Sequence, residues 1–372
     1  MSEHVIVGIS GGVDSAVAAL TLIEAGHDVA GLFMKNWDDP DDPGHCTIPH
    51  DLAAAEAVCA HLGIPLHRVD FTARYWHRVF EHFLAEYSAG RTPNPDILCN
   101  REIKFRAFLE HARELGAESI ATGHYARTAG AEDGPALLRG LDAGKDQSYF
   151  LHAIDREALA LTRFPLGEMD KSSVRERARA AGLPNHARPD STGICFIGER
   201  HFREFLASYL PAKGGEMVSV DGTHLGHHHG LMYYTLGQRQ GLGIGGGHGD
   251  DGQPWYVVDK DLANNRLIVG QGHDHPRLFA TAVVTECPHW LAAEPHAPFD
   301  CEAQVRYRQR PLPCRVEPRS DTLRVTFEAP VRAATPGQSV VLYSGERCLG
   351  GAVIASIERA EQTQPTESAA AP

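Results

Sequence analysis

The sequence lacks several features that would each have indicated a class of protein. No apolar run approaches the roughly 20 residues of a membrane span, so we expect no transmembrane segment. None of the eight cysteines forms a C-x-x-C pair, which argues against a structural zinc site. The formal net charge is −13, with no excess of positive charge. This argues against general affinity for nucleic acid, although a local basic patch could still bind it.

The N-terminus also lacks a secretory signal, because Met1 to His4 lead directly into a strand-like run. We therefore expect a cytoplasmic protein, in which most cysteines stay reduced. At 372 residues the chain is expected to form two or three domains.

The clearest motif is Gly-Ile-Ser-Gly-Gly-Val-Asp-Ser at residues 8–15. A β-branched run at residues 5–7 precedes it, and an alanine-rich helical pattern at residues 15–25 follows. Adjacent glycines let several N–H groups point at one spot, and the start of a helix adds positive potential there. The pattern predicts a phosphate or pyrophosphate pocket; the alternative is an ordinary glycine turn between a strand and a helix.

The loop differs from the common phosphate loops. It has neither the Gly-Lys-Ser/Thr ending of a Walker loop nor the Gly-x-Gly-x-x-Gly dinucleotide fingerprint. It resembles the PP-loop of the N-type ATP pyrophosphatases. That resemblance implies ATP and Mg²⁺ as cofactors, adenylation of a substrate, and release of pyrophosphate. Asp14 would help to hold Mg²⁺ that arrives with ATP, and no metal is expected on protein ligands alone.

Strand and helix patterns alternate through the first part of the chain. Strands are expected at residues 29–34, 66–71 and 119–122, with helices between them. This alternation predicts an α/β fold with a doubly wound parallel sheet. Ligands bind beyond the carboxyl ends of such strands. We therefore expect the glycine loop, Met34 and the Gly123–His124 pair to converge on one cleft.

After about residue 200 glycine becomes frequent and the apolar runs become short, which predicts a small β-barrel or sandwich near the C-terminus. The expected domains are a catalytic domain at 1–205, a small central domain at 206–277 and a β-barrel at 278–358. Residues 359–372 are expected to be a disordered tail. The run of histidines at 227–229 is interpreted as a solvated loop rather than a metal site.

Two cysteines lie in unusual surroundings. Cys99 follows a segment with two prolines, which we expect to form a rigid extended loop. A helix is expected to begin at about Asn100, beside Arg101 and Lys104. A helix N-terminus and nearby cations favour a thiolate. Cys195 lies in a polar, glycine-containing stretch before another expected helix. These contexts leave two interpretations open: a reactive pair, or two unrelated cysteines of which one or both are buried.

Five motifs occur in a characteristic order: the loop at 8–15, Asn-Pro-Asp-x-x-Cys-Asn, Ala-Thr-Gly-His-Tyr-Ala, Lys-Asp-Gln-Ser-Tyr-Phe-Leu and Ser-Thr-Gly-Ile-Cys-Phe-Ile-Gly. From about residue 5 to about 355 the chain resembles the bacterial tRNA-specific 2-thiouridylases of the MnmA type. The resemblance implies an ATP-pyrophosphatase domain, a central domain and a C-terminal β-barrel that contacts tRNA. It also implies a sulfurtransferase that places sulfur on C2 of the wobble uridine of tRNAs for lysine, glutamate and glutamine, releasing AMP and pyrophosphate.

The resemblance assigns roles to individual residues. ATP is expected to contact Gly8, Ile9, Ser10, Gly11, Gly12, Val13, Asp14, Ser15, Met34 and Gly123. The target base is expected to meet Asn94, Pro95 and Asp96, with Cys99 as nucleophile and Cys195 as carrier of a persulfide. Contacts with tRNA are expected from His124, Lys145, Asp146, Gln147, Tyr307, Arg308 and Gln338. Arg306, Arg308, Arg310 and Arg315 around Tyr307 form either a tRNA phosphate patch or a solvated strand face.

The implied chemistry leaves two routes open. The persulfide on Cys195 attacks C2 directly and Cys99 resolves the disulfide, or Cys99 first releases hydrosulfide from it. Both routes end with a Cys99–Cys195 disulfide that a reductant opens. The expected partners are tRNA and a sulfur-donor protein, either a cysteine desulfurase or a relay protein, with a monomer when free. The alternatives are another PP-loop adenylating ligase that forms an amide, or an RNA-binding module with a vestigial nucleotide site.

Overall fold

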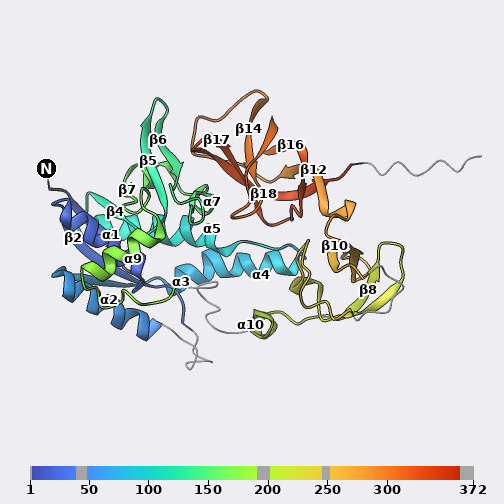
Figure 1. Cartoon of the computed structure of the whole chain (residues 1–372), viewed down its shortest axis with the longest axis horizontal. Coiled ribbons are helices and arrows are strands. Elements are labelled where there is room, and N and C mark those ends of the chain that lie inside the picture. The colour runs from blue at the N-terminus through green and yellow to red at the C-terminus, as the bar shows by residue number, and fades with distance from the viewer. Residues whose placement is uncertain (1, 39–47, 191–201, 245–251, 361–372) are drawn as a thin grey trace, which may run out of the picture.

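A computed structural model of the chain describes residues 2–38, 48–190, 202–244 and 252–360. Three parts follow one another: a first domain with a parallel sheet, a small domain with a four-stranded sheet, and a closed β-barrel (Figure 1). This arrangement confirms the predicted fold class. Within these ranges, none of the helices combines the length and the apolar character that a bilayer crossing requires.

The sheet of the first domain is parallel and has the strand order β3-β2-β1-β4-β7. Its strands are β1 (His4–Gly8), β2 (Asp28–Lys35), β3 (Leu66–Asp70), β4 (Ser119–Ala121) and β7 (Thr162–Arg163). β1 lies in the middle, where Val5 pairs with Val29 of β2 and with Ser119 of β4. Val5, Ile6 and Val7 are completely buried, as expected for a parallel sheet that is covered on both faces.

Helices cover the two faces of this sheet. Val5 and Val7 share a core with α1 (Val13–Glu24), α2 (Ile48–Leu62) and α9 (Lys171–Ala180). Ile6 points to the opposite face and shares a core with α6 (Phe108–Glu114), α7 (Ser148–Leu151) and α8 (Arg156–Ala160). The other helical segments of this domain are α3 (Thr72–Tyr75), η2 (Trp76–Phe80), α4 (Glu81–Ser88), α5 (Pro95–Cys99) and η3 (Asn100–Ala107). α4 extends toward the second part of the molecule, whereas α5 lies near α7 (Figure 1).

The central part contains a sheet with the order β10-β11-β8-β9. Its elements are α10 (Phe202–Tyr209), β8 (Gly215–Ser219), β9 (His224–His228), η4 (Leu231–Tyr233), β10 (Trp255–Asp261) and β11 (Arg266–Gln271). Phe205 and Leu206 of α10 are buried in a cluster with aromatic residues of η2 and α4. The domain boundary expected after residue 205 falls inside this helix.

The histidine run corrects one expectation. His227 and His228 lie in strand β9 rather than in a solvated loop, and the His228 ring is buried. Its Nε2 is 3.0 Å from the carbonyl oxygen of Asn265, and its Nδ1 accepts a hydrogen bond from the N–H of Gly230. Burial lowers the pKa of His228. In the described part of the chain, no group of three or more metal-ligating side chains is arranged to hold an ion.

The C-terminal part is a barrel of six strands, which confirms the predicted architecture. They are β12 (Phe279–Thr285), β14 (Phe299–Gln304), β15 (Leu312–Arg319), β16 (Thr322–Arg332), β17 (Ser339–Ser344) and β18 (Arg347–Glu358). β12 pairs with both β16 and β18, and this closes the barrel. The short elements η5 (Pro276–Leu278) and β13 (His289–Trp290) flank β12. Most of the tail expected at residues 359–372 lies outside the described residues.

A hairpin of the first domain is hydrogen-bonded to the barrel. It consists of β5 (Ala126–Ala131) and β6 (Gly134–Arg139), and Leu137 and Leu138 of β6 pair with Cys348 and Arg347 of β18. Leu137, Tyr343 and Cys348 belong to the same core cluster as Ile6. The barrel is therefore attached directly to the domain that carries the glycine loop.

Candidate active site

The glycine loop is a strand–turn–helix junction, as predicted. β1 ends at Gly8 and α1 begins at Val13, with Gly12 at its N-cap, where no side chain caps the helix. Hydrogen bonds within the loop hold its serines. The N–H of Ser10 donates to Ser15 Oγ at 3.2 Å, and Ser15 Oγ donates to the carbonyl of Gly12 at 3.1 Å. An uncapped first turn presents N–H groups and positive potential, which suits an anion such as a phosphate.

The carboxyl ends of β1, β2 and β4 converge at this loop. A side chain built on Gly8 would lie 3.3 Å from Met34 Cε at the end of β2. One built on Gly123, just after β4, would lie 2.8 Å from the backbone of Asp14 and of Ser15. The structure thus brings the loop, Met34 and Gly123 together, as expected from the parallel sheet.

Replacing Gly123 by alanine is expected to damage this site. The new Cβ would overlap the backbone at the start of α1, which cannot move as a flexible side chain can. We expect a loss of about 1–3 kcal/mol in the free energy of unfolding, with weaker ATP binding. Thermal denaturation and calorimetric titration measure the two effects. Gly130→Ala is the matched control, because nothing lies within 4 Å of a Cβ at that position; equal effects in both variants would contradict this role of Gly123.

Asp14 contacts a lysine that the loop itself does not contain. Lys171, the first residue of α9, places Nζ 2.7 Å from Oδ1 and 2.8 Å from Oδ2 of Asp14. The Tyr125 hydroxyl donates a hydrogen bond of 2.8 Å to Oδ1 of the same carboxylate. Burial and the Asp14 charge raise the pKa of Tyr125 far above its ordinary value, so that this hydroxyl remains a donor.

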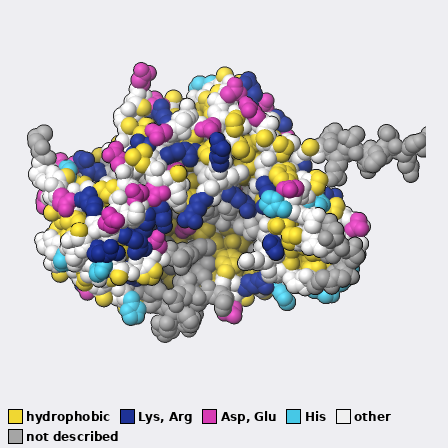
Figure 2. Space-filling model, in the orientation of Figure 1, with side chains coloured by type: hydrophobic (Ala, Val, Ile, Leu, Met, Phe, Trp, Pro, Cys, Tyr) yellow, Lys and Arg dark blue, Asp and Glu magenta, His cyan; other side chains and the backbone are white. Residues whose placement is uncertain are grey.

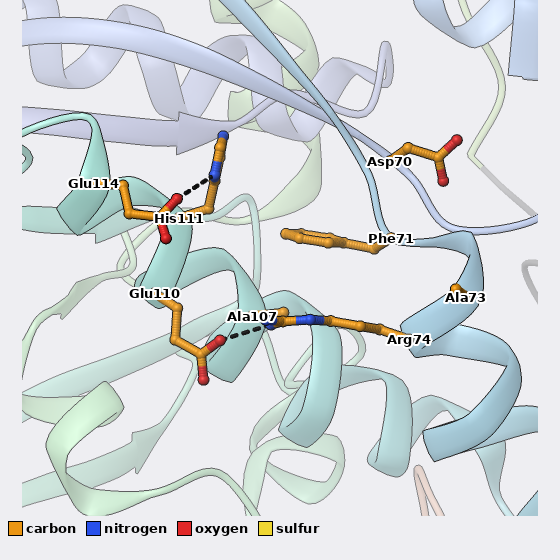
Figure 3. Close-up of a pocket in the computed structure, with 8 residues that line it drawn as sticks. All are labelled: Asp70, Phe71, Ala73, Arg74, Ala107, Glu110, His111 and Glu114. Atoms are coloured by element: carbon orange, nitrogen blue, oxygen red, sulfur yellow. Dashed lines mark hydrogen bonds and ion pairs between the residues drawn. The ribbon is translucent and has the colours of Figure 1, made fainter.

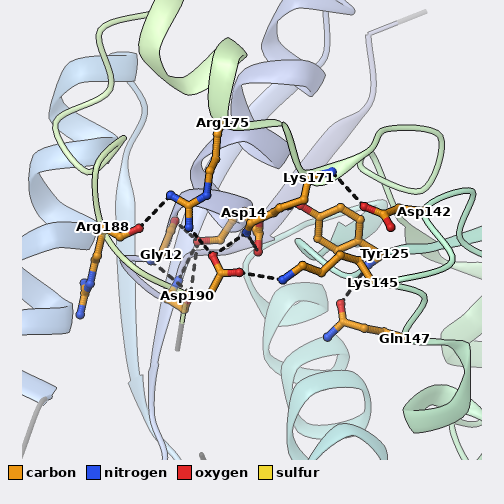
Figure 4. Close-up of polar contacts among 12 residues, drawn as sticks. Gly12, Asp14, Tyr125, Asp142, Lys145, Gln147, Lys171, Arg175, Arg188 and Asp190 are labelled. Carbon is orange, nitrogen blue, oxygen red and sulfur yellow. Dashed lines mark hydrogen bonds and ion pairs between the residues drawn. The ribbon is translucent and has the colours of Figure 1, made fainter. Parts of the chain in front are cut away.

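A second carboxylate, Asp190, forms ion pairs with the cations next to the loop (Figure 4). Its Oδ1 is 2.8 Å from Lys171 Nζ and 2.6 Å from Arg175 Nη2, and its Oδ2 is 2.8 Å from Lys145 Nζ. Burial alone would raise the pKa of Asp190, but hydrogen bonds from Lys145 and Lys171 outweigh burial and hold this pKa well below its usual range. Arg175 also donates to the carbonyl of Arg188, whose own guanidinium donates to the carbonyl of Gly11.

The segment before Cys99 corrects the expected helix start. α5 begins at Pro95, one turn earlier than expected, and Asn94 caps it by accepting a hydrogen bond from the N–H of Asp96 at 3.2 Å. Cys99 is the last residue of α5, and the helix continues into η3. The thiol is therefore not at a helix N-terminus, and the macrodipole argument for a thiolate does not hold at this position.

Cys99 is also more deeply buried than its sequence context indicated. It is 1% exposed and belongs to a core cluster with Trp37, Tyr75 and Phe80. This burial agrees with the interpretation as a buried core cysteine, which the sequence left open beside that of a reactive pair. Asp96 lies one helical turn before it, and burial raises the pKa of this carboxyl, opposed by the charge of Lys104. Cys195 lies outside the described residues.

Family models of known proteins match all three parts of the chain. Residues 3–199 match the family model described as tRNA methyl transferase HUP domain. Residues 203–271 match its PRC-barrel domain, and residues 280–354 match an aminomethyltransferase beta-barrel domain. A protein of Stutzerimonas stutzeri named tRNA-specific 2-thiouridylase MnmA is 58% identical over 356 residues, which is 95% of each chain. The chain belongs to this family.

Two further members of the MnmA family carry the same name. That of Haemophilus influenzae is 57% identical over 357 residues, 95% of this chain and 93% of its own. That of Escherichia coli O6:K15:H31 is 56% identical over 356 residues, 95% of this chain and 97% of its own.

Solved structures are matched more weakly. A U34-tRNA thiolase NcsA from Methanococcus maripaludis has a TM-score of 0.33 at 15% identity, over 56% of this chain and 65% of its own. A 4-thiouridine synthetase–RNA complex with bound ATP has a TM-score of 0.34 at 16% identity, over 56% of this chain and 50% of its own. These scores do not establish a shared overall fold.

The MnmA resemblance implies tRNA contacts from four residues of the first domain, and their side chains lie in different environments. His124 is buried, with Nδ1 2.8 Å from the Thr122 hydroxyl, and burial lowers its pKa to about 3. Asp146 accepts hydrogen bonds from Gly140 and Ser148, and Gln147 Oε1 accepts one from the N–H of Tyr125. Lys145 contacts Asp190, which Lys171 connects to the loop carboxylate Asp14. The contacts with tRNA stay predictions.

In the barrel, Arg308 adopts a left-handed backbone with φ of 62°, and its guanidinium lies 5.1 Å from the centre of the Tyr307 ring. Such a backbone in a residue other than glycine is uncommon and often marks a functional site. Gln338 Nε2 donates a 2.7 Å hydrogen bond to the carbonyl of Thr92, shortly before Asn94. The neighbouring Arg306 is not a surface phosphate contact in this structure, because it donates to the carbonyl of Leu236 and to the Thr335 hydroxyl.

A separate cavity lies between α3 and α6 (Figure 3). Four of its lining side chains form two pairs: Arg74 lies 2.6 Å from Glu110, and His111 lies 3.0 Å from Glu114. Asp70 lies 3.6 Å from Lys35, which does not line the cavity. None of residues 8–15 lines it. This cavity is therefore distinct from the predicted nucleotide site.

Sequence reasoning missed Lys171, Arg175 and Asp190. All three reach the loop from a distant part of the chain, so no local motif marks them. The one available signal was Asp170 before Lys171: its carboxylate accepts from the N–H of Ser173 and caps α9. This cap predicts a helix that begins with a lysine, but not where that helix packs.

Proposed function

We propose that the chain is a tRNA 2-thiouridylase, a sulfurtransferase that uses ATP to replace the C2 oxygen of the wobble uridine by sulfur. The observation that carries this proposal is the match of about 95% of the chain to relatives named tRNA-specific 2-thiouridylase. The uncapped start of α1 after the glycine loop, and the Asn94-capped helix that ends at Cys99, support it.

In the first step, the C2 oxygen of the uridine attacks the α-phosphorus of ATP, and pyrophosphate leaves. The N–H groups at the start of α1 and the cation of Lys171 are suited to bind this leaving group. Lys171 thereby supplies the positive charge that a Walker loop takes from its own lysine. Residues 8–15, Met34 and Gly123 form the expected ATP site.

Mg²⁺ is expected to arrive with ATP, where it would neutralise charge that develops on the leaving pyrophosphate. Asp14 is the carboxylate of the loop, and its donor chemistry suits Mg²⁺. Both of its oxygens contact Lys171 in this structure. An ion held by Asp14 would therefore compete with Lys171 for this carboxylate.

In the second step, sulfur displaces the adenylated oxygen, and AMP leaves. The sulfur is expected as a persulfide on Cys195, and Cys99 either resolves the resulting disulfide or releases hydrosulfide beforehand. Both routes form a Cys99–Cys195 disulfide, with a reductant restoring the thiols. Because Cys99 is almost completely buried, either route requires that the residues covering its sulfur move during the cycle.

The expected nucleic-acid partner is tRNA for lysine, glutamate or glutamine, with the target base turned out of its stack. Lys and Arg side chains gather over the middle of one face of the molecule, which offers phosphates a local cationic surface despite the net charge of −13 (Figure 2). A sulfur-donor protein, a cytoplasmic location and a monomeric free state belong to the same proposal.

The competing proposal is a PP-loop ligase that adenylates its substrate and transfers an amino group. Thiolation of transcribed tRNA distinguishes the two, with retarded migration in a mercury-containing gel as the readout. We expect retardation of tRNA for lysine only when ATP, the protein and a persulfide source are all present. A tRNA with a cytidine at the wobble position is the control. Unretarded tRNA together with ammonia-dependent AMP formation would favour the ligase.

A further inference from the structure

Three cations beside the glycine loop converge on one carboxylate. Lys145, Lys171 and Arg175 each place a nitrogen within 2.8 Å of an oxygen of Asp190. They come from three places: the turn before α7, the first residue of α9, and the second turn of α9. Such a convergence of donors on a small anion is how proteins bind a phosphate.

The cation cluster is continuous with the phosphate loop. Lys171 bridges Asp14 in the loop and Asp190. Asn185 and Arg188, a few residues before Asp190, both donate to the carbonyl of Gly11, at 2.9 Å and 3.2 Å. The carboxylate of Asp190 therefore lies among the cations nearest to the loop (Figure 4).

The backbones of the two lysines are anchored independently of Asp190. Asp142 Oδ2 accepts a hydrogen bond from the backbone N–H of Lys171, and its carbonyl accepts one from the N–H of Lys145. The Lys171 side chain is 13% exposed, so its ammonium has little water to replace a lost partner. If Asp190 moved away, Lys145, Lys171 and Arg175 would lose the carboxylate that they share, which is an attractive arrangement for another anion.

We propose that Asp190 is a built-in substitute for a phosphate, which occupies the cations of the nucleotide site until the phosphates of ATP or pyrophosphate displace it. This inference rests on the proposed function, because it takes the glycine loop to be the ATP site. Asp190 then weakens the binding of nucleotide and of product pyrophosphate. It also keeps three cations paired while the site is empty.

The test is calorimetric titration of the full chain with inorganic pyrophosphate and Mg²⁺. Asp190→Asn keeps the size of the side chain and removes its charge, and we expect pyrophosphate to bind about tenfold more tightly. Adenosine, which has no phosphate, should bind equally to both proteins. Asp300→Asn is the matched control, because Asp300 pairs with Arg315 at 2.9 Å on the barrel; it should leave pyrophosphate binding unchanged.

Thermal unfolding and two more variants distinguish competition between Asp190 and phosphate from a purely structural role of Asp190. Without ligand, Asp190→Asn should unfold at a lower temperature than the unsubstituted chain, because the variant leaves cations unpaired. With saturating pyrophosphate, Asp190→Asn should unfold at a higher temperature than the unsubstituted chain. Lys171→Met should weaken pyrophosphate binding. When Lys171→Met is combined with Asp190→Asn, most of the increase in pyrophosphate affinity that Asp190→Asn produces alone should disappear.

The outcomes are distinguishable. If the unsubstituted chain binds pyrophosphate, and Asp190→Asn binds it equally or more weakly, the inference fails and the nucleotide site stands. If neither protein binds pyrophosphate or ATP, the assignment of the glycine loop fails, and the inference fails with it.

Discussion

Serine in place of Cys99, and separately in place of Cys195, is expected to abolish thiolation of tRNA, lowering the rate by at least about a thousandfold. A serine hydroxyl neither carries a persulfide nor closes a disulfide, so both sulfur routes stop. The mercury-gel assay measures the product. Calorimetric titration should show that ATP still binds, because Cys99 lies in a core cluster separate from that of the loop residues Val13 and Ile9.

Cys287→Ser is the control for these variants, because Cys287 is an exposed free cysteine in the loop after β12. It should thiolate at the unsubstituted rate. Near-normal thiolation by both the Cys99 and the Cys195 variants would rule out the two-cysteine mechanism. Loss of ATP binding by Cys99→Ser would instead show that packing around α5 supports the nucleotide site.

Lys171→Met and Asp14→Ala are each expected to slow tRNA-dependent pyrophosphate release by roughly a hundredfold or more. Lys171 provides the cation nearest to the loop carboxylate, at 2.7 Å, and Asp14 positions that cation or the magnesium ion. An enzyme-coupled pyrophosphate assay with saturating tRNA measures the effect. If the affinity for ATP changes less than the rate of pyrophosphate release, these groups act mainly on the departing pyrophosphate.

Lys213→Met serves as the control, since Lys213 is an exposed lysine before β8 in the central part. Its rate should match that of the unsubstituted chain. Unchanged release in Lys171→Met would remove Lys171 from the site, even though it touches Asp14. Unchanged release in Asp14→Ala would remove the loop carboxylate from the mechanism.

The glycine loop could be predicted from sequence because its signals are local. A buried strand, two glycines and a helix start lie within about a dozen residues, and the strand ends then meet at the loop because the sheet is parallel. Lys171 and Asp190 could not be predicted in the same way. Lys171 reaches Asp14 from 157 residues away through the packing of α9 on α1, and Asp190 contacts Lys171 from the segment after α9, neither of which a local pattern encodes.

The helix that carries Cys99 was misplaced although its signals were present. Asn94 followed by Pro95 is a typical N-cap and first helical residue, and the two prolines were interpreted instead as an extended loop. The burial of Cys99 depends on aromatic residues such as Trp37 and Phe80, which come from separate segments. Similarly, the pairing of hairpin β5–β6 with the barrel joins residues about 210 positions apart.

The central claim is that ATP activates the C2 oxygen of the uridine, so that this oxygen leaves as part of AMP. It is tested most directly with an anticodon stem-loop RNA that carries oxygen-18 at C2 of the wobble uridine. After a single turnover with ATP and a persulfide source, mass spectrometry of the AMP should show that it contains the label. Unlabelled AMP, with thiolated RNA formed and oxygen-18 in water, would contradict adenylation of the base.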